Sequence, residues 1–205
     1  MRTATITAAR PAVKPPPPFY RAACALYNRQ RQALQRGKNV PILREGELDI
    51  ISHSAEQTRR LGARLGSLLQ AGDIICLSGD MGAGKTVFAA GIGRGWGATA
   101  PLTSPTYNLI HQHRRDKDKQ VLYHLDCYRL ESAAAAERVG LDDVLDGRGP
   151  VVFEWPEYIE EALPDKRLWI ELRILEQTRR NFIFNASGTR YAALIEQFRG
   201  STFGV

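Results

Sequence analysis

The feature that most constrains the fold is a glycine-rich segment that directly follows an apolar run. Residues 74–78 (IICLS) form a continuous apolar stretch, which predicts a strand buried on both faces of a sheet. Residues 79–86 (GDMGAGKT) match G-x-x-x-x-G-K-[ST] at every fixed position, and a helix is expected from Lys85 to about Arg94. This order of strand, loop and helix predicts an α/β fold, a P-loop NTPase-like mixed sheet flanked by helices.

The residue types of this loop suit the binding of a nucleoside triphosphate. Lys85 is expected to reach the β- and γ-phosphates, and the Thr86 hydroxyl is expected to bind Mg²⁺. The helix that follows directs the positive end of its dipole at the phosphates. No Asn-Lys-x-Asp guanine motif occurs, so the expected cofactors are ATP and Mg²⁺. Glycines allow a tight turn that points backbone N–H groups at phosphate oxygens, and the candidate binding residues are Met81, Gly82, Ala83 and Gly84.

A P-loop site needs a second anchor for Mg²⁺, usually an acidic residue at the end of a neighbouring buried strand. Glu154 ends the apolar run 151–153, and Asp126 ends the run 121–125. Glu154 is the better candidate because its run is more uniformly apolar. Asp126 is a candidate for orienting water or for completing the metal shell. His124 lies two residues before Asp126 and therefore shares its face of the strand.

Charge divides the chain into an extension and a domain. Residues 1–44 contain nine lysines and arginines and no acidic residue, whereas residues 45–205 contain the other 19 and all 22 acidic residues. We therefore predict a basic, proline-rich extension over residues 1–46 and a P-loop ATPase domain over residues 47–205. For the extension, the sequence leaves open an organelle transit peptide, a basic arm that contacts nucleic acid, and an overlong start-site assignment.

The composition favours a soluble protein in a reducing compartment. No apolar run approaches the roughly 18 residues of a membrane-spanning helix. The three cysteines, Cys24, Cys76 and Cys127, are odd in number and widely spaced, which argues against a disulfide framework or a zinc site. We expect a cytoplasmic protein with no membrane partner, and we expect Cys76 to be a buried small hydrophobe.

The remaining elements follow from hydrophobic periodicity and turn residues. Ser52 or Ser54 is expected to cap a helix that runs to about Leu69. His111 and His113 lie two apart on a strand, and without a third ligand they favour a solvated strand face over a metal site. The other predicted elements are an antiparallel hairpin of strands 107–113 and 121–126, a helix over 131–138, strands over 151–155, 168–175 and 182–185, and a last helix capped by Thr189 and ending near Phe198.

Taken together, four motifs resemble one protein family. They are the loop 79–86, then Ser-Pro-Thr-Tyr at 104–107, then HLDCYRL at 124–130, then Glu-Trp-Pro at 154–156. In this order and spacing they resemble the TsaE family of bacterial P-loop ATPases, from about residue 52 to 198. The resemblance implies a role in making threonylcarbamoyladenosine in tRNA, together with the TsaB–TsaD pair that transfers the threonylcarbamoyl group made by TsaC. It implies that ATP hydrolysis resets that complex and that tRNA is contacted indirectly.

The resemblance also implies roles for individual residues. Thr86 and Glu154 hold Mg²⁺, while Lys85 and the loop backbone hold the phosphates. Thr106 is the switch threonine, and Asp126 is important for hydrolysis. Three further residues are implied neighbours of the nucleotide: Trp155, Arg179 and Ala55. Three positions depart from the family pattern, because Met81 and Cys127 stand where leucine is common and Val87 stands where a hydroxyl residue is common.

A small-molecule P-loop kinase is the alternative function. Such an enzyme would need an acceptor pocket and usually an arginine-rich lid over the phosphates. The basic loop of residues 114–119 is the one candidate for a lid, and Asp116 and Asp118 interrupt it. We interpret this loop as a solvated turn, which favours the ATPase over the kinase.

Overall fold

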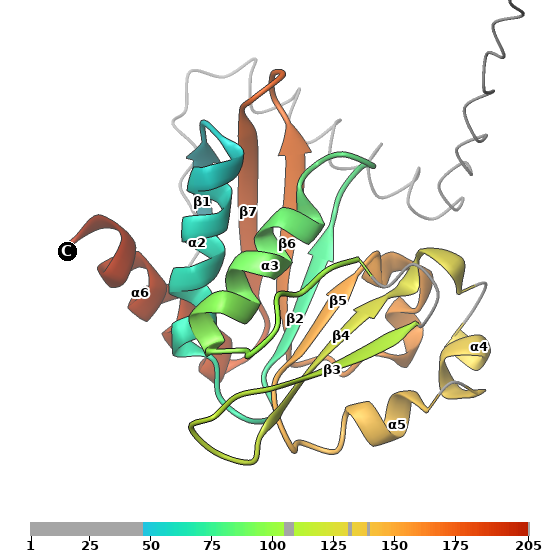
Figure 1. The fold of residues 1–205 in the computed structure, drawn as a ribbon. Coiled ribbons are helices and arrows are strands. Elements are labelled where there is room, and N and C mark those ends of the chain that lie inside the picture. The colour runs from blue at the N-terminus through green and yellow to red at the C-terminus, as the bar shows by residue number, and fades with distance from the viewer. Residues whose placement is uncertain (1–46, 105–108, 131–132, 139, 205) are drawn as a thin grey trace, which may run out of the picture. The chain divides into compact units, whose positions relative to one another are not determined.

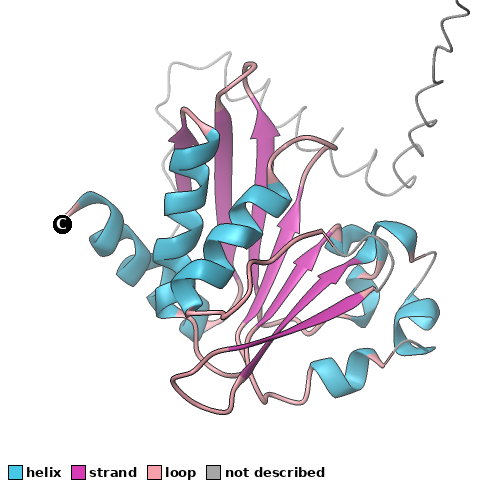
Figure 2. Cartoon of the chain, viewed as in Figure 1, coloured by secondary structure: helices cyan, strands magenta, loops and turns pink. Residues whose placement is uncertain are grey.

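The computed structural model describes residues 47–104, 109–130, 133–138 and 140–204. These residues form a seven-stranded sheet with helices packed against it (Figures 1 and 2). None of the helices in these ranges is long and apolar enough to cross a membrane. In chain order the elements are β1 (Glu47–Ser52), α2 (Ala55–Leu68), β2 (Ile74–Ser78), α3 (Lys85–Trp96), β3 (Ile110–Arg114), β4 (Val121–Asp126), η1 (Cys127–Arg129), α4 (Ala133–Arg138), α5 (Leu141–Val144), β5 (Val151–Glu154), η2 (Pro156–Tyr158), η3 (Glu160–Ala162), β6 (Leu168–Ile174), β7 (Arg180–Ala186) and α6 (Thr189–Phe203).

The sheet is mixed, with a parallel centre and antiparallel margins. The strand order is β1-β7-β6-β2-β5-β4-β3. β2 pairs in parallel with both β6 and β5, and β5 pairs in parallel with β4. The pairs β1–β7, β6–β7 and β3–β4 are antiparallel. Every residue of β2 and β5 is buried, as their apolar runs predict, and the expected mixed α/β sheet is confirmed.

Each face of the sheet carries its own hydrophobic core, because successive side chains of a strand point to opposite faces. α2, α3 and α6 supply the helical side of the larger core, in which the rings of Phe88 and Phe182 lie 5.0 Å apart. The smaller core packs β4 and β5 against the short helices α4 and α5. Cys76 and Cys127 lie in this smaller core as buried free thiols, which confirms the prediction for Cys76.

Glycines let α2 and α3 pack almost backbone to backbone. A Cβ atom on Gly62 would lie 2.3 Å from the carbonyl oxygen of Phe88, and one on Gly95 would lie 1.8 Å from that of Ala63. Real side chains do not tolerate such distances, so these positions require glycine. The close contact holds α3 in place over the sheet, and the segment before α3 is the glycine-rich loop.

Most predicted elements are present, with three differences. Ser54 caps α2 by accepting a hydrogen bond from the Gln57 N–H, as predicted. The prediction that Thr189 caps the last helix is wrong, because Thr189 is its first residue and Gly188 occupies the cap position at φ 96°. That helix also extends to Phe203 rather than Phe198. The sequence did not identify β1, whose six residues pair with β7. Residues 1–46 lie outside the described part of the chain.

Candidate nucleotide-binding site

The glycine-rich loop connects the end of β2 to the start of α3, and two glycines show why the motif is needed. Gly79 has φ 131°, and a Cβ atom there would lie 2.1 Å from the carbonyl oxygen of Leu172. Gly84 caps α3 in the left-handed conformation at φ 101°. A Cβ atom on Gly84 or Gly82 would meet nothing within 4 Å, so there is open space beside both glycines, and both line a pocket. An open loop at a helix N-terminus has the arrangement of an anion-binding site.

Lys85 lies at the centre of this loop, and 4% of it is exposed. Its ammonium donates hydrogen bonds to the carbonyl oxygens of Gly79 (2.6 Å) and Asp80 (2.9 Å). Burial lowers the pKa of Lys85 to about 8, although the carboxylates of Glu157 and Glu154 act in the opposite direction. The side chain therefore remains mostly cationic at neutral pH.

Trp155 covers the Lys85 ammonium, whose nitrogen lies 3.4 Å from the centroid of the indole ring. Trp155 has φ 59°, and among the described residues it is the one non-glycine residue with positive φ. This conformation costs about 1–2 kcal/mol for an L-residue. It begins the turn into η2 and directs the indole toward Lys85, while the ring of Tyr128 packs 5.0 Å away. Strained backbone of this kind is typical of functional sites.

The two predicted carboxylates meet at one edge of the sheet. β4 and β5 are parallel neighbours, and their register pairs Asp126 with Glu154. Glu154 Oε2 accepts a hydrogen bond from the Thr86 hydroxyl at 2.9 Å, and Glu154 Oε1 lies 2.9 Å from His124 Nε2. The acid that contacts Thr86 is thus Glu154, the one favoured by its apolar strand.

Asp126 lies beside this pair but has different partners. Its Oδ2 accepts a hydrogen bond from the Ser104 hydroxyl (3.2 Å), and its Oδ1 accepts one from the Tyr128 N–H (3.0 Å). Burial raises the pKa of Asp126, and the nearby charge of Glu154 adds to this effect. Asp126 is therefore a candidate proton acceptor rather than the direct partner of Thr86.

The oxygens of Thr86 and Glu154 fit a magnesium ion. Mg²⁺ prefers octahedral oxygen ligands at about 2.1 Å, so two ligands at a right angle are about 3 Å apart. The observed separation of 2.9 Å between Thr86 Oγ1 and Glu154 Oε2 matches this spacing. The donor set is one hydroxyl and one carboxylate, with space for phosphate oxygens and water. In the described ranges no group of three His, Cys, Asp or Glu side chains offers a competing metal site.

A pocket of about 370 Å³ brings most of the predicted residues together. Tyr128, a further candidate from the motif at 124–130, also lines it, as does Ser104 from the motif at 104–107. Ala83 lies in the loop but is fully buried, and it does not line the pocket. The lining residues are Met81, Gly82, Gly84, Lys85, Thr86, Val87, Ser104, Asp126, Tyr128, Glu154 and Trp155.

Two predicted neighbours of the nucleotide, Arg179 and Ala55, do not line this pocket. Arg179 lies in the turn between β6 and β7 and pairs with Glu176 at 2.9 Å. Its neighbour Arg180 instead reaches the loop and donates a hydrogen bond to the carbonyl oxygen of Gly82 at 3.2 Å. Ala55 is the exposed first residue of α2. Thr106 lies outside the described residues.

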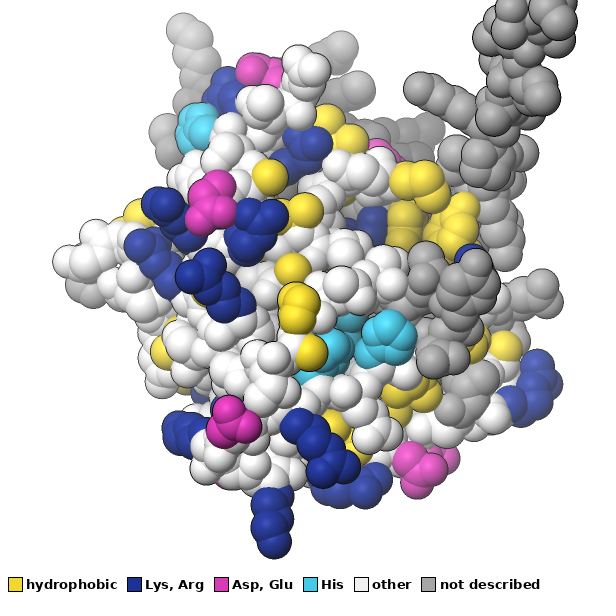
Figure 3. Space-filling model, in the orientation of Figure 1, with side chains coloured by type: hydrophobic (Ala, Val, Ile, Leu, Met, Phe, Trp, Pro, Cys, Tyr) yellow, Lys and Arg dark blue, Asp and Glu magenta, His cyan; other side chains and the backbone are white. Residues whose placement is uncertain are grey.

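The histidines of β3 differ from expectation. A solvated face was favoured for His111 and His113, and this is wrong for His113, which is 8% exposed. The preceding segment covers β3, since the Thr99 N–H donates to the carbonyl oxygen of Arg114 at 2.9 Å. Burial lowers the pKa of His113, and the charges of the neighbouring histidines act in the same direction. On the face shown in Figure 3, histidine side chains gather near the centre of the view.

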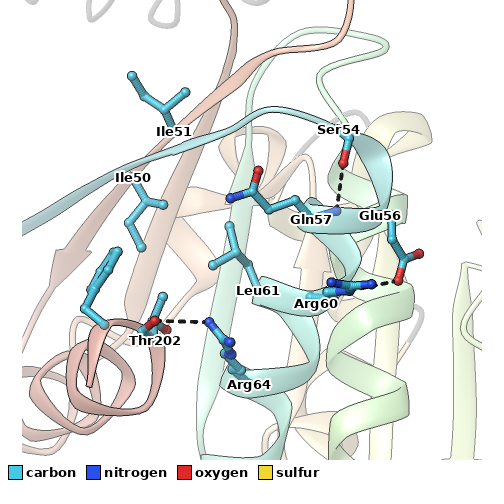
Figure 4. Close-up of a pocket in the computed structure, with 10 residues that line it drawn as sticks. Ile50, Ile51, Ser54, Glu56, Gln57, Arg60, Leu61, Arg64 and Thr202 are labelled. Carbon is cyan, nitrogen blue, oxygen red and sulfur yellow. Dashed lines mark hydrogen bonds and ion pairs between the residues drawn. The ribbon is translucent and has the colours of Figure 1, made fainter. Parts of the chain in front are cut away.

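A second and larger pocket, of about 550 Å³, lies away from the loop (Figure 4). It is formed by the end of β1, one face of α2 and the end of α6. Arg64 reaches from α2 toward α6 and donates a hydrogen bond to the carbonyl oxygen of Thr202 at 3.3 Å, whereas Arg60 turns to Glu56 at 3.2 Å. This pocket contains no glycine loop, and its carboxylate, Glu56, is paired with Arg59 and Arg60 rather than with a hydroxyl group. The smaller pocket at the loop, which has the glycine loop and the Thr86–Glu154 pair, is therefore the candidate nucleotide site.

Comparisons with known proteins agree on one family. The profile of the family described as "Threonylcarbamoyl adenosine biosynthesis protein TsaE" matches residues 52–182. A Bacillus subtilis protein named tRNA threonylcarbamoyladenosine biosynthesis protein TsaE is 37% identical over 142 residues, covering 69% of this chain and 87% of the relative. A Treponema pallidum protein of the same name is 36% identical over 130 residues and is covered to 94% of its length.

A comparison of folds also finds a similar solved structure. The crystal structure of Bacillus subtilis YdiB superposes with a TM-score of 0.65 at 31% sequence identity, covering 76% of this chain and 95% of that one. The matched region of the family profile contains the glycine-rich loop, both strand-end carboxylates and Trp155. The chain therefore belongs to the TsaE family.

Proposed function

We propose that this protein is a Mg²⁺-dependent ATPase that serves the biosynthesis of threonylcarbamoyladenosine in tRNA. The observation that carries this proposal is the contact between the Thr86 hydroxyl and Glu154 Oε2 at the mouth of an open glycine loop. The loop supplies backbone amides, Lys85 supplies a cation, and Thr86 and Glu154 supply hard oxygen ligands. The relatives that this chain resembles are named for the same biosynthesis.

In the proposed reaction the residues bind, orient and accept a proton, and none of them forms a covalent bond to a phosphate. The amides of residues 81–84 and the Lys85 ammonium hold the phosphates. Thr86 and Glu154 hold Mg²⁺, which when bound neutralises charge on the β- and γ-phosphate oxygens. Asp126, held by Ser104, orients a water molecule and accepts its proton. The water oxygen bonds to the γ-phosphorus as the bond to the β–γ bridging oxygen breaks, which yields ADP and phosphate.

The partners follow from the family rather than from the site. We infer that the protein acts with TsaB and TsaD in the cytoplasm and that it contacts tRNA indirectly through that complex. We also propose that residues 47–205 form the ATPase domain and that residues 1–46 are a separate basic extension. The 22 acidic residues all lie outside residues 1–44, which supports this division.

The position of the basic loop disfavours a kinase. Arg115 packs its guanidinium 4.3 Å from the ring centroid of Trp96 and donates a hydrogen bond to the carbonyl oxygen of that residue. Trp96 is the last residue of α3, and Lys85 is the first. A helix of this length separates its ends by about 16 Å, so the basic loop lies far from the phosphates and does not have the position of a lid.

Glu154→Gln tests the site. The variant should bind a non-hydrolysable ATP analogue without the increase in affinity that Mg²⁺ gives the wild type, and phosphate release should fall by at least about tenfold. Glu196→Gln, on the exposed surface of α6, is the matched control and should behave as wild type. A normal Mg²⁺ titration in Glu154→Gln would reassign the metal to Asp126.

The role in tRNA modification requires a separate experiment. A strain depleted of its own TsaE should regain threonylcarbamoyladenosine in its tRNA when this chain is expressed. Lys85→Ala should fail to restore the modification. Failure of the wild-type chain to restore it, despite normal ATP hydrolysis in vitro, would refute the proposed pathway and leave the ATPase intact.

A further inference from the structure

Glu154 is held on both of its carboxylate oxygens. Oε2 accepts a hydrogen bond from the Thr86 hydroxyl, and Oε1 is hydrogen-bonded to His124 Nε2, each at 2.9 Å. His124 lies on β4, where the parallel register pairs it with Val152 of β5. Glu154 is two residues beyond Val152 and therefore projects from the same face as the imidazole. The strand pairing itself thus brings the ring to the carboxylate.

The direction of the hydrogen bond follows from the chemistry of the two groups. An ionised carboxylate only accepts, so the imidazole donates from Nε2. His124 is fully buried, and its Nδ1 has no hydrogen-bond partner in the part of the chain that the structure describes. A proton on that nitrogen would be a buried donor without an acceptor, at a cost of about 1–3 kcal/mol. The hydrogen-bond pattern therefore assigns the proton that His124 donates to Nε2.

We propose that His124 is the positioning residue for Glu154: its Nε2–H fixes Oε1, so that Oε2 faces Thr86 and the metal position. The inference rests on the proposed function, in which Glu154 and Thr86 hold Mg²⁺. A free glutamate side chain has several rotamers, and fixing one costs conformational entropy each time the metal binds. Because His124 orders the carboxylate before the metal binds, metal binding loses less side-chain conformational entropy.

The neighbouring histidines do not share this role. The ring of His113 lies 6.5 Å from that of His124, and the ring of His111 lies 6.3 Å beyond it. Glu154 has no hydrogen bond to either ring in the described structure, and the three rings do not form a metal site there. His113 is therefore a matched control: it is a buried histidine on the same face that does not touch the metal-binding carboxylate.

The experiment measures how strongly Mg²⁺ raises the affinity for a fluorescent, non-hydrolysable ATP analogue. His124→Leu removes the donor and keeps an apolar side chain of similar size. Loss of a group that orients a metal ligand typically weakens metal affinity 10- to 100-fold, so the Mg²⁺ concentration at half-effect should rise by about that factor. Affinity for the analogue without Mg²⁺ should change less than about threefold. His113→Leu should leave both quantities as in the wild type.

Two further variants keep the test decisive if His124→Leu does not fold. Glutamine places an N–H donor near the position of the histidine Nε2, whereas asparagine is one methylene shorter. His124→Gln should retain Mg²⁺ dependence within about threefold, and His124→Asn should lose it about as leucine does. Thermal unfolding without nucleotide identifies variants that are folded.

The outcomes separate the two proposals. Mg²⁺ dependence in folded His124→Leu or His124→Asn equal to that of the wild type would overturn the positioning role. Equal losses in the glutamine and asparagine variants would also overturn it, because the donor would then not be the property that matters. If the wild type itself bound the analogue without any Mg²⁺ effect, the proposed function would fail instead.

Discussion

Replacing Glu157 with glutamine should stabilise the protein increasingly as pH rises from about 4.5 to about 7, and should leave its stability at pH 4 nearly unchanged. Glu157 lies in η2 and is 4% exposed, and its Oε2 has no hydrogen-bond partner in the described structure. Burial raises the pKa of this carboxyl group from 4.5 to about 7. Its own backbone N–H and the Lys85 ammonium oppose the shift, whereas the carboxylates of Glu160 and Glu171 add to it.

The magnitude follows from proton linkage. The unfolded chain releases this proton near pH 4.5, and the folded chain releases it near pH 7. Between these values the folded state binds more protons than the unfolded state, so the free energy of unfolding falls as pH rises through this window. The gap between the two pKa values corresponds to about 3 kcal/mol. Glutamine does not ionise, so the advantage of Glu157→Gln should grow from near zero at pH 4 to about 3 kcal/mol at pH 8.

Urea unfolding of both proteins at pH 4, 6 and 8 measures this difference. Subtracting wild type from variant at each pH removes the contribution of every other titrating group. Glu161→Gln, an exposed neighbour in η3, is the control and should differ from wild type by only a few tenths of a kcal/mol at each pH. A stability difference for Glu157→Gln that does not change with pH would refute the reasoning, since the buried carboxyl group would then not be the titrating group.

Three further predictions test the loop and the domain boundary. Lys85→Ala should weaken Mg-ATP binding by about 2–3 kcal/mol, because the phosphates lose a charge-assisted donor; calorimetry measures the dissociation constant, and an unchanged value would contradict the site. Gly79→Ala should lower the free energy of unfolding by at least about 2 kcal/mol, because its Cβ would lie 2.1 Å from a carbonyl oxygen, whereas Gly97→Ala, in open space at φ 92°, should cost about 1 kcal/mol in the same urea assay. Deleting residues 1–46 should leave affinity for ATP within about twofold of wild type by calorimetry, and a collapsed fold would show that the extension packs on the domain.

Local sequence was sufficient for the part of the site that is continuous in the chain. The apolar run 74–78, the glycines after it and the Lys-Thr pair lie within thirteen consecutive residues, so one strand, one loop and one helix N-terminus follow from them. Ser54 as the cap of α2 and the antiparallel hairpin of β3 and β4 were predictable for the same reason. Each of these features depends on residues close in sequence, which contact each other in almost any fold.

Contacts between distant segments were harder to predict. Arg180 rather than Arg179 reaches the loop because of the register of β6 with β7. His113 is buried because of the path that residues 98–100 take beside β3. The left-handed backbone of Trp155 had no local signal either, since tryptophan rarely adopts that conformation. The short strand β1 is stabilised by pairing with β7, near the other end of the chain.

The choice between Glu154 and Asp126 as the partner of Thr86 depended on both the sequence and the tertiary structure. The sequence by itself determined that a strand-end acid would face the loop, and it favoured Glu154 while leaving Asp126 possible. The tertiary structure decided the matter, because β5 is the immediate neighbour of β2 and β4 is one strand further away. Thr86 and Glu154 are 68 residues apart in the chain. Only the order of strands in the sheet brings their oxygens to hydrogen-bonding distance, and that order depends on packing across the whole domain.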